Sequence, residues 1–471
     1  MSYRRREWRI IEIQLDFAQN IWKERPEMSM EPVFSLEDEY TGEKIGSKLE
    51  RIREIMKENG CNAHVLSSLD DIAWLLNIRG NDIAYCPLVL SYAIVYNNSV
   101  ELFADIRKFS DDIINLLAEN QVKIYPYEDI YRKVSEMTSE DKLLLDSSIM
   151  NYSLYQSISK ETVIVDKQNP EILMKSVKNE TQAENLRKAH LKDAVAHTKV
   201  YVLVKEEYWQ SGDYRVVCFC RLEGLRTEQE HFLGPSFGPI SAYGEHGAIV
   251  HYSADEKSNV PLKEGKLFMT DTGGHYLEGS TDITRTVALG EVGNIEKEHF
   301  TLVARAMLRL ANTVFLYGCS GANLDCIARE VFWKEGLNFN HGTGHGVGYL
   351  LNIHEGPINF RWKEGERPAP ALEENMVITD EPGIYIEGSH GIRLENELLV
   401  RKTVKNEYGQ FMNFEILTYV PIDLDAILPE KMSTEEKEML NHYHKQVYEK
   451  VSPYLSEEER IWLKEYTRAV K

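Results

Sequence analysis

The sequence predicts an α+β protein, built from a small α/β domain followed by a larger α+β domain. Residues 45–171 alternate helical and strand patterns, which is typical of a small α/β unit. Residues 172–432 combine long amphipathic helices with apolar, strand-like runs, so we expect helices that support a sheet. Of the 471 residues, 43% are hydrophobic, which is enough for the cores of both domains.

The first part of the chain is predicted from its local patterns. Residues 1–44 are interpreted as a helix, amphipathic over residues 8–22, followed by an extended connector. Within the α/β domain, the patterns predict helices at 47–59 and 111–117 and strands at 63–67, 91–96, 99–104 and 142–146.

The larger domain is predicted to open with a long helix, because Asn179 and Gln182 have the spacing of a capping box. A second helix at 299–317 carries apolar residues on one face as far as Val314. The remaining patterns predict a helix at 322–335, strands at 266–272, 282–289, 376–380 and 391–400, and a polar, helical surface appendix at 433–471.

The charge and the cysteines limit the possible partners and compartment. Lys plus Arg number 54 and Asp plus Glu number 75, so the net charge is −21. This argues against nucleic acid and anionic membranes, because phosphate binding needs a basic face. None of the six cysteines forms a CxxC pair, and the basic start lacks the apolar stretch of a signal peptide. We therefore expect a cytoplasmic protein with reduced thiols and no membrane segment.

Four acidic residues interrupt apolar, strand-like segments of the larger domain. Asp271 ends one predicted strand, and Asp282, eleven residues later, opens the next. Glu381 and Glu395 lie fourteen residues apart in two further apolar segments. A carboxylate in a buried strand must be paired, hydrogen-bonded or metal-bound. Each residue alone could be an ordinary turn or cap residue, and their order and spacing together indicate a site.

His345 completes a possible ligand set. It lies in HGTGHGVGYLLNIHEGP, where closely spaced glycines let the backbone pass near a crowded centre. Four carboxylates and one imidazole form a hard, oxygen-rich set that can hold two divalent ions through bridging carboxylates. The ligand hardness favours Mn²⁺, with Zn²⁺ or Co²⁺ as alternatives.

From about Gly46 to its end, the chain resembles the X-prolyl aminopeptidases (aminopeptidase P) of the larger, eukaryotic-like type. This family belongs to the pita-bread metallopeptidases, which also include prolidase and methionine aminopeptidase. The matching motifs are GAIVHY, DTGGHYLEGSTDITRT, HGTGHGVGYLLNIHEGP, TDEPGIY and GIRLENELL, and WLLNIRGNDIAYCPLVLSYAIV matches the preceding domain. The resemblance implies a pita-bread catalytic domain behind a creatinase-N-like domain. HGTGHGVG followed by N-x-HEGP favours this family over prolidase.

The resemblance also implies a role for each candidate residue. Asp271 is expected to bind one metal ion, His345 and Glu381 the second, and Asp282 and Glu395 both. Substrate binding is assigned to His251, His341, His354, Tyr385 and Arg393, with the last two beside the metal ligands, and catalysis to His251, His354 and Glu381.

The implied reaction is hydrolysis of an N-terminal Xaa-Pro bond by a hydroxide held between two metal ions. Glu381 would accept a proton from the water and pass it to the leaving proline nitrogen. The histidines would donate to the developing oxyanion. The expected partners are peptides with proline at the second position.

Alternatives stay open at this point. A prolidase, which cuts only Xaa-Pro dipeptides, shares all five metal ligands, whereas creatinase-like hydrolases lack them. An inactive pita-bread module that binds peptides has no need of two bridging carboxylates. The family also has a complete α/β domain ahead of residue 45, of which only the last segment is matched. We expect this to affect the peptide-length range and a possible homodimer, while the chemistry, which lies after residue 240, needs only the second half.

Overall fold

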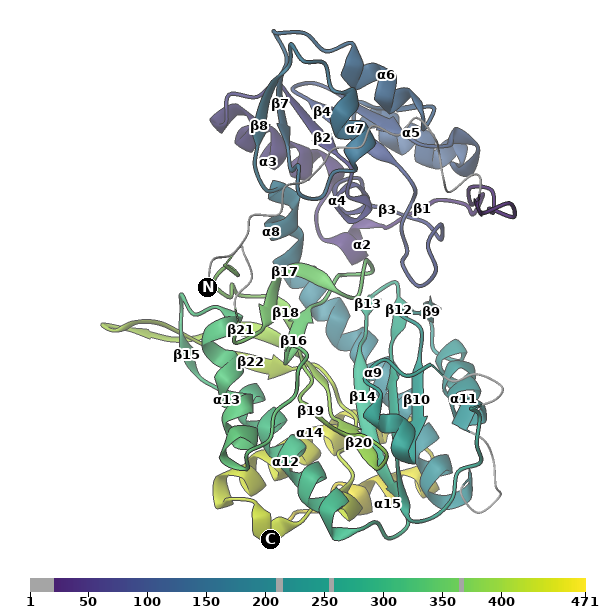
Figure 1. Ribbon diagram of the computed structural model, residues 1–471, viewed down its shortest axis with the longest axis vertical. Coiled ribbons are helices and arrows are strands. Elements are labelled where there is room, and N and C mark those ends of the chain that lie inside the picture. Colours follow the sequence, from purple (N-terminus) through teal and green to yellow (C-terminus); the bar gives the residue numbers. More distant parts are fainter. Residues whose placement is uncertain (1–20, 209–214, 254–257, 364–367) are drawn as a thin grey trace.

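The computed structural model describes residues 21–208, 215–253, 258–363 and 368–471. Two bodies follow one another along the longest axis, with the α/β domain above the larger domain (Figure 1). The helix expected at 8–22 lies almost entirely outside the described residues. Among the described residues, no helix has both the length and the apolar character needed to cross a membrane.

The α/β domain is a six-stranded sheet with helices packed against it. Its strands follow the order β6-β5-β4-β2-β7-β8, and all the strands and helices predicted here are confirmed to within two residues. The strands are β2 (Ala63–Leu66), β4 (Tyr92–Tyr96), β5 (Val100–Phe103), β6 (Val122–Tyr125), β7 (Lys142–Leu145) and β8 (Val163–Asp166). The helices are α3 (Ile45–Glu58), α4 (Leu69–Leu75), α5 (Asp111–Glu119), α6 (Asp129–Ser135) and α7 (Tyr152–Ser157).

The segment before residue 45 packs against this domain. Strand β1 (Phe34–Ser35) pairs antiparallel with β3 (Ile78–Arg79), and the short helix α2 (Asp38–Thr41) lies against the long helix of the larger domain. Val33 is buried in a core of the α/β domain. The domain boundaries at 44/45, 171/172 and 432/433 stay predictions.

Helices flank the sheets of the larger domain. After α8 (Pro170–Ser176), the long helix α9 (Glu180–Leu203) starts with the predicted capping box. Helix α13 (Gly321–Lys334) is confirmed, and α11 spans Arg215–Thr227. The prediction of a helix at 299–317 is wrong at both ends, because α12 spans Asn294–Ala311. Val314 lies beyond that helix and is 64% exposed, just before the short strand β15 (Phe315–Leu316).

The predicted strand at 391–400 is two strands, one ending at Arg393 and the next beginning at Asn396, and they pair with different partners. Glu395 lies in the break, and its N–H donates to the carbonyl of Thr284 (3.0 Å). The two main sheets have the orders β10-β11-β14 and β15-β22-β21-β18-β16-β17. The strands are β9 (Phe232–Pro235), β10 (Ile240–Tyr243), β11 (Lys266–Thr272), β12 (Gly274–Tyr276), β13 (Gly279–Ser280), β14 (Ile283–Leu289), β16 (Gly344–Gly346), β17 (Glu355–Phe360), β18 (Val377–Asp380), β19 (Gly383–Ile386), β20 (His390–Arg393), β21 (Asn396–Asn406) and β22 (Gly409–Ile416).

The C-terminal segment is helical, but its description as a surface appendix is wrong. Helices α14 (Thr434–Val451) and α15 (Glu457–Tyr466) bury Leu440, Tyr443 and Leu463 in the main core. The Tyr443 hydroxyl donates to the carbonyl of Val420 (2.6 Å) and accepts from Arg285 (2.7 Å). The segment is polar in overall composition, but each helix has one narrow apolar face, and an amphipathic helix packs onto a core through such a face.

Candidate metal centre

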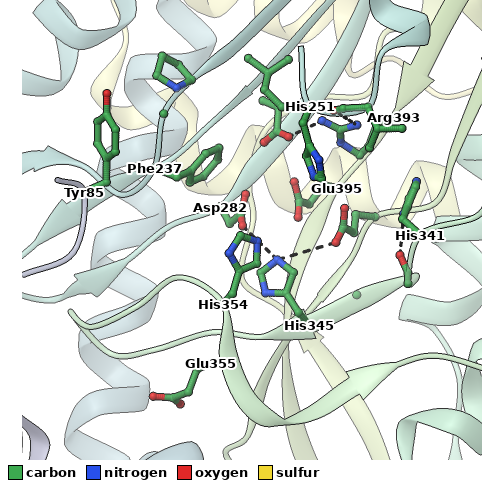
Figure 2. A pocket seen from close by; sticks show the side chains of 18 of the residues that line it. Tyr85, Phe237, His251, Asp282, His341, His345, His354, Glu355, Arg393 and Glu395 are labelled. Carbon is green, nitrogen blue, oxygen red and sulfur yellow. Dashed lines mark hydrogen bonds and ion pairs between the residues drawn. The ribbon is translucent and has the colours of Figure 1, made fainter. Parts of the chain in front are cut away.

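A cavity of about 1220 Å³ lies in the larger domain, where strand ends of the two sheets meet. It is lined by nine of the ten predicted site residues, and Figure 2 shows Asp282, Glu395 and His345 pointing toward one another. Tyr385 is the predicted substrate-binding residue that does not line it. The nine are His251, Asp271, Asp282, His341, His345, His354, Glu381, Arg393 and Glu395.

Each carboxylate lies at or next to a strand end. Asp271 is the second-last residue of β11 and pairs with Thr284 of β14, and Asp282 comes directly before β14. Glu381 directly follows β18, and Glu395 lies between β20 and β21. Antiparallel pairing within each sheet therefore brings residues far apart in sequence to one place.

The tautomer of His345 presents a ligating nitrogen to the carboxylates. Its Nδ1 donates to the carbonyl of Gly346 (3.0 Å), so Nε2 carries the free lone pair. That Nε2 lies 3.4 Å from Asp282 Oδ2 and 3.8 Å from Glu381 Oε1. One ligand atom from each of Asp282, His345 and Glu395 lies within 4.8 Å of the others.

The electrostatics of these carboxylates favour a bound cation. Burial, and then the charges of Asp271 and Glu381, raise the pKa of Asp282 well above its ordinary value. Burial, and then the Asp282 charge, do the same to the pKa of Glu395. Asp271 Oδ1 is buried without a hydrogen-bond partner. Since an unpaired buried charge is costly, this donor set fits hard divalent ions.

A hydrogen-bonded chain runs behind the carboxylates. Arg393 forms an ion pair with Asp271, and its Nη1 donates to the Tyr385 hydroxyl (2.9 Å). That hydroxyl lies 2.9 Å from His341 Nε2, while His341 Nδ1 donates to the carbonyl of Gly342 (2.7 Å). Burial lowers the pKa of His341 to about 4, so its Nε2 accepts from Tyr385 at neutral pH. Tyr385 therefore does not line the cavity but holds Arg393 and His341, which do.

Two histidines face the cavity from opposite loops. The rings of His354 and His345 lie 4.3 Å apart, and burial, followed by the nearby His345, lowers the pKa of His354 to about 4. His251 follows a short helical segment, Gly244–Ala248, that touches β20. A Cβ on Gly391 would lie only 1.6 Å from the carbonyl oxygen of Gly247, so this close backbone contact requires glycine.

Several residues that shape the site were not predicted. Glu397 accepts the backbone N–H of Asp282 (2.6 Å), and Thr284 donates to Glu395 Oε2 (2.6 Å). Glu397 could have been found, because it follows Glu395 by two residues, the spacing that places side chains on one face of a strand. Tyr85 of the α/β domain also lines the cavity, and it lies in the matching segment WLLNIRGNDIAYCPLVLSYAIV, to which no site residue was assigned.

The α/β domain also holds the loop that carries His354. Arg79 donates to the carbonyls of Tyr349 (3.1 Å) and Leu350, and Asp70 accepts the N–H of Asn352 (3.0 Å). Leu351 is buried in a core of that domain. We expected the chemistry to need only the second half of the chain. This loop departs from that expectation, because contacts from the α/β domain hold it in place.

Comparison with known proteins places these features in one family. Residues 184–402 match metallopeptidase family M24, residues 24–182 match the creatinase/prolidase N-terminal domain, and residues 410–470 match the C-terminal region of peptidase M24. Aminopeptidase P1 of Arabidopsis thaliana is 33% identical, with 100% of this chain and 80% of that protein covered. Xaa-Pro aminopeptidase 1 of Dictyostelium discoideum is 36% identical, covering 92% and 69% respectively.

Solved structures of related enzymes have the same fold as this chain. An X-prolyl aminopeptidase from Caenorhabditis elegans, described as a cytosolic enzyme with a di-nuclear active site, matches with a TM-score of 0.91. It is 33% identical, and the match covers 98% of this chain and 76% of that one. A Xaa-Pro dipeptidase from Bacillus anthracis shares the fold, with a TM-score of 0.64 at 24% identity over 81% of this chain and 99% of that one. The predicted pita-bread fold behind a creatinase-type domain is confirmed.

Proposed function

The chain belongs to the aminopeptidase P family of M24 metallopeptidases, and on this premise we propose that it removes the first residue of peptides whose second residue is proline. The observation that carries the proposal is the convergence of four carboxylates and His345 on one cavity, where Arg393 pairs with Asp271 alone among these carboxylates. That charge pattern suits two divalent ions and a hydrolytic reaction.

We assign the metal ligands as the family resemblance implies. Asp271 would hold one ion, His345 and Glu381 would hold the second, and Asp282 and Glu395 would serve both. When bound, the two ions supply Lewis-acid activation of a water and of the scissile carbonyl. The oxygen-rich donor set favours Mn²⁺.

The remaining side chains position the peptide and move protons. Glu381, whose pKa is raised by burial, accepts a proton from the attacking water and delivers it to the proline nitrogen. His251 and His354 face the cavity and donate to the developing oxyanion. The Arg393–Tyr385–His341 chain holds His341 in a fixed orientation on the proline side.

The cavity size favours an aminopeptidase over a prolidase. At about 1220 Å³ it exceeds the range of roughly 300–1,000 Å³ typical of small-molecule sites, so it has room for a chain beyond the proline. We also propose a cytoplasmic location, by analogy with the cytosolic C. elegans enzyme. A homodimer stays a prediction, which sedimentation of the purified protein would test.

The test uses the full chain reconstituted with Mn²⁺ and three matched substrates: Xaa-Pro-Yaa, Xaa-Ala-Yaa and the dipeptide Xaa-Pro. We expect release of the first residue from Xaa-Pro-Yaa and at least about 100-fold lower kcat/KM on Xaa-Ala-Yaa. Equal rates on proline and alanine peptides would contradict the specificity. Cleavage of the dipeptide alone would identify a prolidase instead.

A further inference from the structure

A buried lysine at the junction of the two domains pairs with the residue that follows His354. Lys178 lies between α8 and α9, where the two bodies of Figure 1 meet. Its backbone N–H donates to the carbonyl of Asn375 (3.1 Å), which ties this segment to the larger domain. The lysine therefore stands at a fixed point of the junction.

Lys178 compensates the charge of Glu355. The two side chains form an ion pair and are only 1% and 3% exposed. The same Nζ donates to the carbonyl of Lys175 in α8 (3.0 Å). Lys175, whose charge also acts on Glu355, forms its own ion pair with Asp71 (2.8 Å). Because Lys175 is already paired, it is a poor substitute for Lys178.

Glu355 has a route into the catalytic cavity. It is the first residue of β17, and its side chain lines the cavity. Its Oε1 accepts from Lys178, whereas its Oε2 is buried without a hydrogen-bond partner in the part of the chain that the structure describes. A buried carboxylate that lost its cation would gain hydration by turning toward the cavity.

His354 and Glu355 point in different directions. In Figure 2, His354 points toward the carboxylate cluster and Glu355 points away from it. Successive side chains of an extended chain project to opposite sides, so the direction of one is coupled to that of the other. A rotation that brought the Glu355 carboxylate into the cavity would therefore turn the His354 ring out of position.

We propose that Lys178 is a positioning residue for the peptidase reaction. It holds the Glu355 carboxylate in the domain junction and thereby keeps His354 directed at the carboxylate cluster. Lys178 does not line the cavity, so it acts through Glu355 and His354. This inference rests on the proposed function, in which His354 donates to the developing oxyanion.

The test is a double-mutant cycle on the full chain reconstituted with Mn²⁺, with Xaa-Pro-Yaa as substrate. Lys178→Met should lower kcat about tenfold and change KM by less than about twofold, because an oxyanion donor acts only in the transition state. In the His354→Ala protein, the same change should lower kcat by less than about twofold. A tenfold loss that persists without His354, or loss of metal from Lys178→Met, would overturn the proposal.

Further variants separate positioning from a general loss of stability. Lys178→Met/Glu355→Gln removes both buried charges, so kcat should return to within about threefold of the wild type. Lys205→Met breaks another buried ion pair, with Asp423, away from the cavity, and should lower the thermal midpoint without changing kcat. A tenfold loss of kcat in this control, or no recovery in the double variant, would contradict the positioning role. If Lys178→Met does not fold, Lys178→Gln, which keeps a donor for the Lys175 carbonyl, replaces it in the cycle.

If the wild type cleaves no Xaa-Pro-Yaa peptide, the proposed function fails, and hydrogen exchange of residues 349–356 still tests the placement of this loop. Lys178→Met should speed amide exchange there at least about fivefold, and Lys205→Met should not. Equal exchange in the two variants would refute the role of Lys178.

Discussion

Two buried acidic clusters in the larger domain differ in how their charge is balanced. Asp193 on α9 accepts from Arg226 Nε (2.6 Å), from the Thr281 hydroxyl (2.6 Å) and from the Tyr276 hydroxyl (3.2 Å). Burial alone would raise the pKa of Asp193, but Arg226, His197 and Thr281 together outweigh burial and bring that pKa to about 2. This cluster is complete within the protein.

Asp282 and Glu395 show the opposite pattern. Both are buried like Asp193, but their charged neighbours are other carboxylates, and their pKa values are raised well above the ordinary range. A compensated buried acid stabilises the fold, whereas an uncompensated group of acids is a site that needs a ligand. The comparison predicts different consequences when each cluster is disturbed.

The largest effect should come from Asp282→Asn in the uncompensated cluster. A bridging ligand serves both ions, so we expect kcat to fall by at least about 10³-fold and metal content to drop below two ions per chain. Elemental analysis and peptide hydrolysis on the same sample measure both. Asp271→Asn should do less damage. Full metal content in the Asp282→Asn protein would remove the bridging role.

Arg226→Met should instead damage the compensated cluster. Removing Arg226, which pairs with buried Asp193, leaves an unpaired charge and should cost about 3–5 kcal/mol of unfolding free energy. Urea unfolding measures the loss, with the exposed Arg107→Met as control. Metal content and kcat per folded molecule should stay near wild type, and loss of both would show that the two clusters are coupled.

His354→Ala and His345→Ala distinguish two neighbouring histidines. His354→Ala should lower kcat about 10²-fold with metal retained, because it is assigned to the oxyanion. His345→Ala should lose metal and activity together. Equal metal depletion in a titration of the two variants would contradict this assignment.

The smallest effect concerns pH and His197, beside Asp193. Burial lowers the pKa of His197 to about 3, below its unfolded value near 6.5. Its neutral form therefore stabilises the fold fully above pH 6.5, and that stability is lost as the pH falls toward 3. Between pH 7 and 5.5 the loss should be about 1 kcal/mol. Urea midpoints at both pH values should show a shallower dependence for His197→Gln, and parallel curves would exclude this contribution.

Only part of this comparison could be read from the sequence. Asp271 and Asp282 were predictable because each interrupts or borders an apolar run within a short segment. Asp193 and Arg226 lie 33 residues apart on two helices, and no motif links them. The strand break at Glu395 was missed because the apolar pattern continues through it, and only the bond to Thr284 on another strand creates it.

The loop before His354 has a consequence for how such a protein can change over evolutionary time. Leu351 completes a core of the α/β domain, and Arg79 of that domain holds the two preceding carbonyls. One short segment is therefore inherited under two constraints, because it must fit the interior of one domain and present a histidine in the other. Recombination that exchanged the first domain for a foreign one would have to restore a pocket for Leu351 before the exchange could be tolerated.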